Sequence, residues 1–280
     1  MRDKSFNLLK QYLFDNIFSL KYLSAIVFVL SYFMPSLLKL NDASATVGLR
    51  MHISGIFFLL VNPWDVMFFF LGYLIVISNV PFKQNIQKQV LVRMGKLRWI
   101  LHQMLYLICT AVIYFLTVMG AFAIILFNSI GVFSNWGKFL GGLSRGDGAL
   151  TEITPSTFIA SPKVLEAYSP MQYFLVVSLI IISVLILFSF VMFVGNLYFN
   201  FLGFLLAGIL LFFSIFVYAS QGYLLYYASP LTWIALNTIG LNPYSKYPSW
   251  SYVIAFIVIG MVLLVSAALY KAKSNSNFDY

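Results

Sequence analysis

Long, unbroken runs of apolar residues, separated by short polar stretches, dominate this 280-residue chain. A helix needs about 20 consecutive apolar residues to cross a membrane, whereas the strands of a membrane barrel alternate in polarity over about ten residues. The unbroken runs therefore predict membrane-spanning helices. We expect six spans, at residues 22–38, 62–80, 99–127, 171–194, 201–220 and 250–270.

Residues 1–20 are predicted to form an amphipathic helix rather than a span. Their apolar positions recur at steps of three and four, and polar positions recur in the same way between them. This spacing places the apolar side chains on one face of a helix, which is typical of helices that lie along the membrane surface. The alternative is an irregular polar terminus. The apolar positions are Phe6, Leu9, Leu13, Ile17 and Leu20.

The second span has two interpretations. Residues 51–80 can form one helix, which places Asp65 inside the membrane. Alternatively, a helix begins at Asn62, after a separate apolar segment at 51–61 that spans, re-enters or lies outside. We favour this second reading, because Asn, Pro and an acid suit the first positions of a helix. It also avoids an isolated carboxylate in the membrane, which costs about 2.5–3.5 kcal/mol.

Composition narrows the class of protein. The chain is 61% hydrophobic and 9% charged, with a mean hydropathy of +0.92. A soluble domain is about 45–50% apolar and about 25% charged, and a soluble fold of this size cannot hide so much apolar surface. We therefore expect a single transmembrane domain over residues 1–280, an all-α membrane protein in a lipid bilayer, with no nucleic acid as partner.

The distribution of the net charge of +9 along the chain indicates the membrane topology. Six spans place both termini on one side, which carries eleven Lys and Arg residues against three acids, whereas the other side carries six against five. Because Lys and Arg collect on the cytoplasmic side, both termini are predicted to be cytoplasmic. The long loop at 128–170 is then extracellular, and the segment at 221–249 also faces outward.

Candidate catalytic chemistry is sparse. His52 and His102 are the two histidines, Cys109 is the single cysteine, and we find no paired carboxylates, HExxH, GxSxG or Walker motif. The later spans lack the ionisable residues that ion-coupled transporters place at mid-membrane. We therefore expect no catalytic, metal or cofactor site in this chain. If it drives transport, ATP and Mg²⁺ are expected on a partner subunit.

The stretch from Pro81 to Arg98 is the most charged part of the chain and contains no acid. A helix at 83–97 would offer bases for charge-assisted bonds and a small apolar footing for a soluble partner. Trp99 would anchor the next span at the membrane interface. The alternative is an ordinary cytoplasmic loop attracted to anionic lipids. The candidate contact residues are Ile86, Lys88, Val90, Arg93, Met94, Lys96 and Leu97.

These features resemble the membrane subunit of an ABC-2 type ABC transporter. The closest local similarities are two short runs. The run VLVRMGKLRW at 90–99 is similar to the entry to the third span in that family, and Ser229–Trp233 is similar to the Pro-containing segment before its outer helices. The resemblance implies that 83–97 is a coupling helix that docks on an ATPase. It also implies two ATPase copies, a second permease chain, identical or similar, and a bacterial plasma membrane. The chain departs from the family in its short 81–98 loop, which lacks the usual acidic residue.

The functional hypothesis is a permease subunit of an ATP-driven exporter. Its substrate would be amphipathic, such as a peptide, a bacteriocin or a drug-like compound. Two alternatives from other classes stay open: a non-transporting membrane sensor or assembly partner, and, disfavoured by the missing chemistry, an intramembrane enzyme.

Overall fold

The computed structural model describes residues 13–81, 95–199, 201–220, 222–240 and 245–273. Five of its helices are long and apolar enough to cross a membrane, and a bent pair of helices brings the number to six if it counts as one span. The protein is therefore a multi-pass, all-α membrane protein. The five helices are α2 (Leu20–Val47), α5 (Lys96–Ile125), α9 (Pro170–Tyr198), α10 (Leu202–Ser220) and α11 (Trp250–Lys273).

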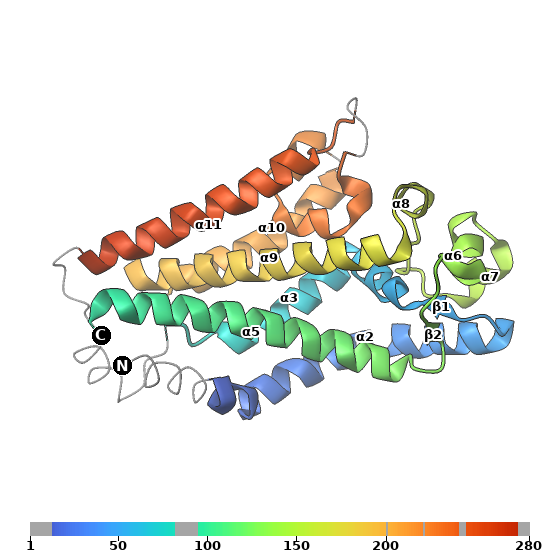
Figure 1. The fold of residues 1–280 in the computed structure, drawn as a ribbon, viewed down its shortest axis with the longest axis horizontal. Helices are drawn as coiled ribbons and strands as arrows, with labels where there is room; N and C mark the ends of the chain where they lie inside the picture. The colour runs from blue at the N-terminus through green and yellow to red at the C-terminus, as the bar shows by residue number, and fades with distance from the viewer. Residues whose placement is uncertain (1–12, 82–94, 200, 221, 241–244, 274–280) are drawn as a thin grey trace.

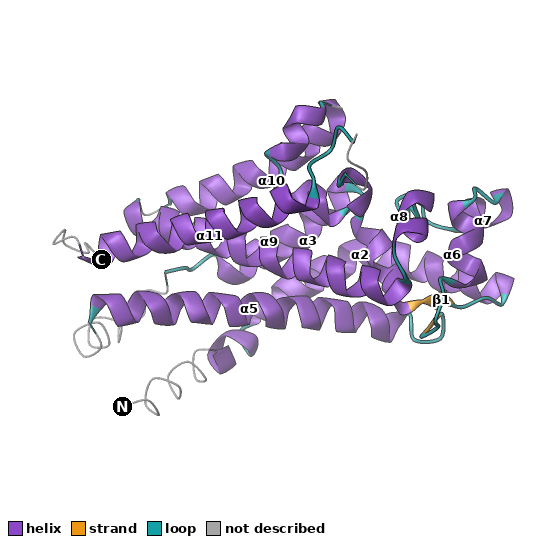
Figure 2. Ribbon diagram, turned by 45° about the horizontal axis from the view of Figure 1, so that its top comes forward, coloured by secondary structure: helices purple, strands orange, loops and turns teal. Residues whose placement is uncertain are grey.

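The helices run side by side along the long axis of the molecule (Figure 1). We call one end the stem end; α5 begins there and α11 ends there (Figure 1). The opposite end carries the short helices and the small sheet, and we call it the cap end (Figure 2). α9, the most apolar helix, packs against α5, α10 and α11.

α2 extends beyond the predicted first span of 22–38 and continues to Val47. Its last turns hold polar residues but pack against the cap, where Ala43 and Ser44 are buried. Gly48 then ends the helix in the left-handed conformation, at φ 67°, which glycine adopts without strain. The helix boundary thus differs from the apolar boundary because one face of the last two turns packs against the cap.

The region of the predicted second span is a bent pair of helices, which forms either a broken span or a re-entrant loop. A 3₁₀ helix, η1 (Ile53–Leu60), meets α3 (Pro63–Ile77) at an angle of 95°. The helix start predicted at Asn62 is confirmed, because the Asn62 side chain caps α3 by accepting the N–H of Trp64 at 3.0 Å. α3 is shorter than the predicted 62–80 span, and its 15 residues reach only about 22 Å.

The η1 segment is buried inside the protein. Residues 54–60 are all buried, and η1 packs against α3, α5 and α9. A break in a helix exposes backbone groups that lipid cannot satisfy, so a broken span requires protein around it.

The predicted 128–170 loop is folded into the cap. A strand, β2 (Ile130–Gly131), pairs in parallel with β1 (Met51–His52), and three short helices follow. Gly141 and Gly142 lie inside the first of these helices, because Phe139, Leu140 and Leu143 give this helix a buried face. The three helices are α6 (Gly137–Ser144), α7 (Gly148–Ile153) and α8 (Pro162–Ala167).

The remaining elements lie at the two ends. Residues 13–17 are helical, and most of the predicted 1–20 helix lies outside the described residues. Between α10 and α11, three 3₁₀ helices close the cap end: η2 (Tyr223–Tyr227), η3 (Pro230–Ile234) and η4 (Leu236–Thr238).

Candidate functional site

We call the most charged stretch of the chain, at residues 81–98, the basic segment. It lies largely outside the described residues. Lys96 and Leu97 open α5, with Leu97 41% exposed. Trp99, expected to be an interfacial anchor, is only 2% exposed, and its ring packs 6.3 Å from that of Phe193 on α9. Its anchoring contact is thus with the bundle. The predicted contact residues that lie outside the described part of the chain are Ile86, Lys88, Val90, Arg93 and Met94.

The other flank of the basic segment is held by a hydrogen bond to the same helix. The Asn196 side chain of α9 donates through Nδ2 to the carbonyl of Val80 at 2.7 Å. Its Oδ1 accepts the backbone N–H of Gly203, at the start of α10, at 2.9 Å. Asn196 is 8% exposed, so both bonds form away from water, where they are stronger than at a surface.

α9 and α10 approach each other closely beside Asn196. A Cβ on Gly195 would lie 2.5 Å from the Cα of Gly203, and a Cβ on Gly203 would lie 2.0 Å from the carbonyl oxygen of Met192. Only glycine fits at these two positions, as is common where membrane helices pack backbone to backbone. The end of α9 and the start of α10 therefore form one tightly packed unit, which we call the α9–α10 hairpin.

The break in the second span holds a buried acid. Asp65, in the first turn of α3, is 4% exposed, so the early helix start does not remove its carboxylate from the protein interior. Tyr32 of α2 donates its hydroxyl to Oδ1 at 2.9 Å. The positive end of the α3 dipole also favours a carboxylate at this position. The carboxylate thus links α2 to the break.

The second carboxylate oxygen is less well satisfied. Oδ2 of Asp65 is buried without a hydrogen-bond partner among the described residues, and so is the hydroxyl of Thr157 from the cap, which lies beside it. Tyr32 is fixed in place because its ring stacks on Phe68, with centroids 3.8 Å apart and planes 13° apart. α2, the break and the cap therefore meet at Asp65.

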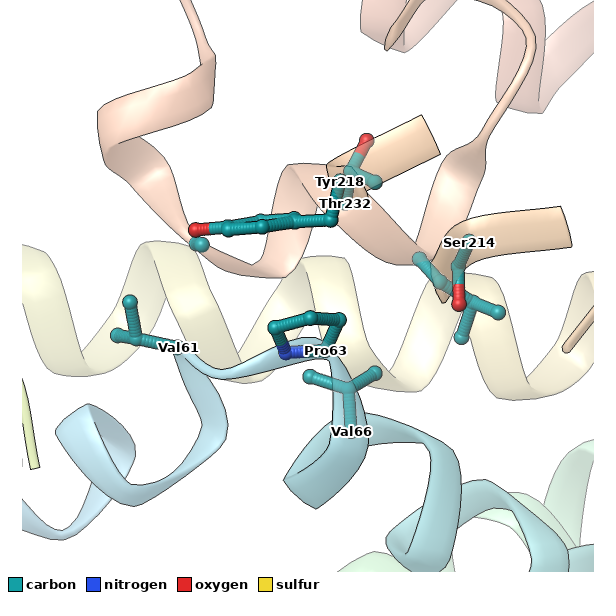
Figure 3. A pocket seen from close by; sticks show the side chains of 8 residues that line it. Val61, Pro63, Val66, Ser214, Tyr218 and Thr232 are labelled. Atoms are coloured by element: carbon teal, nitrogen blue, oxygen red, sulfur yellow. The ribbon is translucent and has the colours of Figure 1, made fainter. Parts of the chain in front are cut away.

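A small pocket lies on another side of the same break, between α3, α10 and η3 (Figure 3). Its volume is about 10 Å³, which is room for about one water molecule. Pro63 and Val66 line it from the break, and Ser214, Tyr218 and Thr232 face them (Figure 3). In this conformation the break offers no space for an amphipathic substrate at this point.

Further buried hydroxyls join α3 to the helices around it. Tyr73 of α3 bonds with Ser189 of α9, and Tyr114 of α5 donates to the carbonyl of Phe69 at 2.6 Å. Gly72 allows this approach, since a Cβ there would lie 2.7 Å from the Tyr114 hydroxyl. α3 is thus held by polar contacts along its whole length.

The histidines lie in separate places. His52 is buried in the cap and accepts the backbone N–H of Ser54 through Nδ1 at 3.1 Å. Burial lowers the pKa of the His52 imidazole, and a backbone hydrogen bond with Phe133 opposes part of that change. His102 is buried near the stem end of α5. Within the described ranges, no three His, Cys, Asp or Glu residues come close enough to hold a metal ion.

No protein-family model, no curated protein and no solved structure matches this chain. Sequence reasoning did not single out two polar residues that join separate elements here, Tyr32 and Asn196. Tyr32 is a polar side chain within the predicted first span, whereas Asn196 lies just after the predicted fourth span, and neither position reveals its partner.

Proposed function

We propose that this chain is the permease subunit of an ATP-driven exporter, energised by a separate ATPase. The supporting observation is that the two flanks of the basic segment are tied to one helix. Asn196 of α9 holds Val80 on one side, and Phe193 of α9 packs on Trp99 on the other. A force applied to the segment by a soluble partner would therefore reach the helix at the centre of the bundle.

The segment is suited to receive such a force. Its bases at Lys88, Arg93 and Lys96 can form charge-assisted bonds with acidic groups of an ATPase. Its two flanks continue into α3 and α5, which begin or end at the stem end. In this proposal the stem end is cytoplasmic, the membrane is a bacterial plasma membrane, and Trp99 fixes the start of α5.

The proposed assembly contains two ATPase subunits and a second permease chain, identical or similar to this one. ATP and Mg²⁺ bind to the ATPase, and this chain supplies the path. The chain's apolar composition fits an amphipathic substrate, such as a peptide, a bacteriocin or a drug-like compound. The bent pair of η1 and α3 is the element we propose to change shape during transport, because the chain changes direction by 95° between them, at Asn62–Pro63.

The test is purification in mild detergent, with charge reversal on both sides of the membrane. A nucleotide-binding subunit should copurify with the unmodified chain and be lost from the variant Lys88→Glu, Arg93→Glu, Lys96→Glu. The matched control is Lys138→Glu, Arg145→Glu, Lys163→Glu, which changes the charge equally at the cap end and should retain the ATPase. If no ATPase copurifies, or if both variants retain it equally, the proposal fails.

A further inference from the structure

A wide, open cavity lies at the cap end along α6, and we call it the α6 cavity. Its volume is about 670 Å³, and sites for small molecules typically have volumes of about 300–1,000 Å³. It is separate from the small pocket beside the break at Pro63. The α6 cavity is lined by α6 and the residues at its two ends, among them Asn135, Trp136, Lys138, Gly141, Gly142 and Arg145.

The spacing of residues along α6 explains this hollow. Lys138 and Arg145 are seven positions apart, so they lie on nearly the same face of the helix, about 10 Å apart along its axis. Gly141 lies between them on that face, and a Cβ there would meet nothing within 4 Å. The opposite face carries Phe139 and Leu143, which are buried and hold α6 on the cap. Two bases therefore flank a stretch of backbone without side chains.

Both bases are available to a ligand. The side chains of Lys138 and Arg145 are exposed, and neither has a hydrogen-bond or ion-pair partner among the residues that the structure describes. Residues 128–170 contain three bases and three acids, yet none of these acids lines the cavity. Asp147, which follows Arg145 by two positions, instead caps α7 by accepting the N–H of Ala149 at 3.2 Å. The α6 cavity is thus positive although this part of the chain is neutral.

Trp136 gives the cavity a fixed apolar wall. Its Nε1 donates to the carbonyls of Leu165 and Tyr168, at 3.0 and 2.9 Å. Its ring also packs edge-on against that of Tyr173, with centroids 5.4 Å apart. Because the ring is held before a ligand arrives, binding does not have to order it. Asn135, next to it, is exposed and adds amide donors to the lining.

Exposed apolar side chains lie close to the α6 cavity. Val132 and Phe133 are both exposed. The ring of His52 lies 6.5 Å from that of Phe133 and 6.4 Å from that of Trp136, so the exposed turn and the cavity wall are neighbours. Bases beside exposed apolar side chains suit a ligand that joins an anionic group to an apolar body.

We propose that the α6 cavity binds a phosphate group attached to an apolar body. Arg145 can donate to two phosphate oxygens at once, and Lys138 can approach a third as a compact charge. Gly141 leaves room for the phosphate between them, and the Trp136 ring covers the apolar part. Both a phospholipid headgroup and a soluble phosphate ester carry this chemistry. The site does not depend on the proposed function.

The test measures binding of three matched probes to the full chain in detergent by native mass spectrometry. The probes are dioctanoyl phosphatidic acid, dioctanoylglycerol, which lacks the phosphate, and glycerol phosphate, which lacks the acyl chains. Phosphatidic acid should bind more tightly than dioctanoylglycerol, and its affinity should fall as the ionic strength rises. If glycerol phosphate does not compete, the source is a lipid, whereas competition at similar concentrations identifies a soluble ester.

Variants separate the site from general attraction to the chain. Lys138→Gln combined with Arg145→Gln should raise the Kd of phosphatidic acid at least about ten-fold. Gly141→Leu fills the cavity without changing the charge and should weaken binding by a similar factor. The matched controls should bind normally: Lys163→Gln removes a base of α8, and Gly148→Leu adds a side chain on α7 where a Cβ also meets nothing within 4 Å.

Two results would overturn the inference. One is that dioctanoylglycerol binds as tightly as phosphatidic acid. The other is that the variants of the α6 cavity bind phosphatidic acid as tightly as the control variants do. If Gly141→Leu does not fold, the charge variant decides alone, because Lys138 and Arg145 are exposed and their replacement leaves the buried face of α6 intact.

Discussion

The hydrogen bond between Tyr32 and Asp65 should be a major support of the broken span, and Tyr32→Phe tests it cleanly. The substitution keeps the ring that stacks on Phe68 and removes only the hydroxyl, which donates to Oδ1 at 2.9 Å. Since Oδ2 already lacks a partner among the described residues, both oxygens of a buried carboxylate would then be unsatisfied. A hydrogen bond to a charged group contributes about 1.5–3 kcal/mol.

The assay is thermal unfolding of the purified chain in detergent. At about 2 °C per kcal/mol for a chain of this size, Tyr32→Phe should lower Tm by about 3–6 °C. The control Tyr198→Phe removes a hydroxyl from a more exposed tyrosine and should lower Tm by no more than about 1 °C. Equal effects of the two substitutions would refute the reasoning.

A double-mutant cycle separates this bond from general damage to the fold. Asp65→Asn removes the charge to which the Tyr32 hydroxyl donates. It should therefore reduce folding stability less in the Tyr32→Phe background than in the parent chain. We expect a coupling energy of about 1 kcal/mol between residues in contact. Simple additivity would mean that Tyr32 and Asp65 act independently.

Two other predictions concern the hairpin and the cap. Gly203→Ala should destabilise the protein by at least about 3 kcal/mol or prevent its folding, because its Cβ would lie 2.0 Å from a backbone oxygen. Gly208→Ala on the same helix meets nothing within 4 Å and should be neutral or slightly stabilising in the same unfolding assay; similar losses at both sites would contradict the close-packing argument. For His52, burial lowers the pKa of the imidazole in the folded state. The contribution of His52 to folding stability is therefore complete above the unfolded-state pKa of about 6.5, and it is lost as the pH falls from there through the lower folded-state pKa. Unfolding measured from pH 8 to pH 5 should therefore show an acid-side loss that His52→Asn reduces, and an identical pH profile in that variant would be evidence against this role.

The apolar runs predict much of the fold because lipid imposes one dominant rule on the chain. Each span must be a helix with enough apolar length, so the positions of α5, α9, α10 and α11 follow within a few residues. The start of α3 is also predictable, since Asn62 and Pro63 carry local capping chemistry. These features depend on neighbouring residues in the sequence.

The features of the fold and of the candidate site that the sequence did not predict depend on contacts between residues far apart in the chain. Tyr32 and Asp65 are 33 positions apart, and Asn196 and Val80 are 116 apart. The sequence identifies these polar residues as unusual for their surroundings but does not give the packing that pairs them. The folded cap is missed for the same reason, because its short helices are held by buried apolar residues such as Phe139, Leu140 and Leu143, whose partners lie in other segments.

The most direct test of the central claim is to identify what touches the basic segment in the cell membrane. A photo-crosslinking amino acid placed at Val90 should form an adduct with an ATP-binding subunit, identified by mass spectrometry, whereas the same probe at the cap residue Lys138 should not. An adduct at Val90 that contains only lipid, or another part of this chain, would contradict the account.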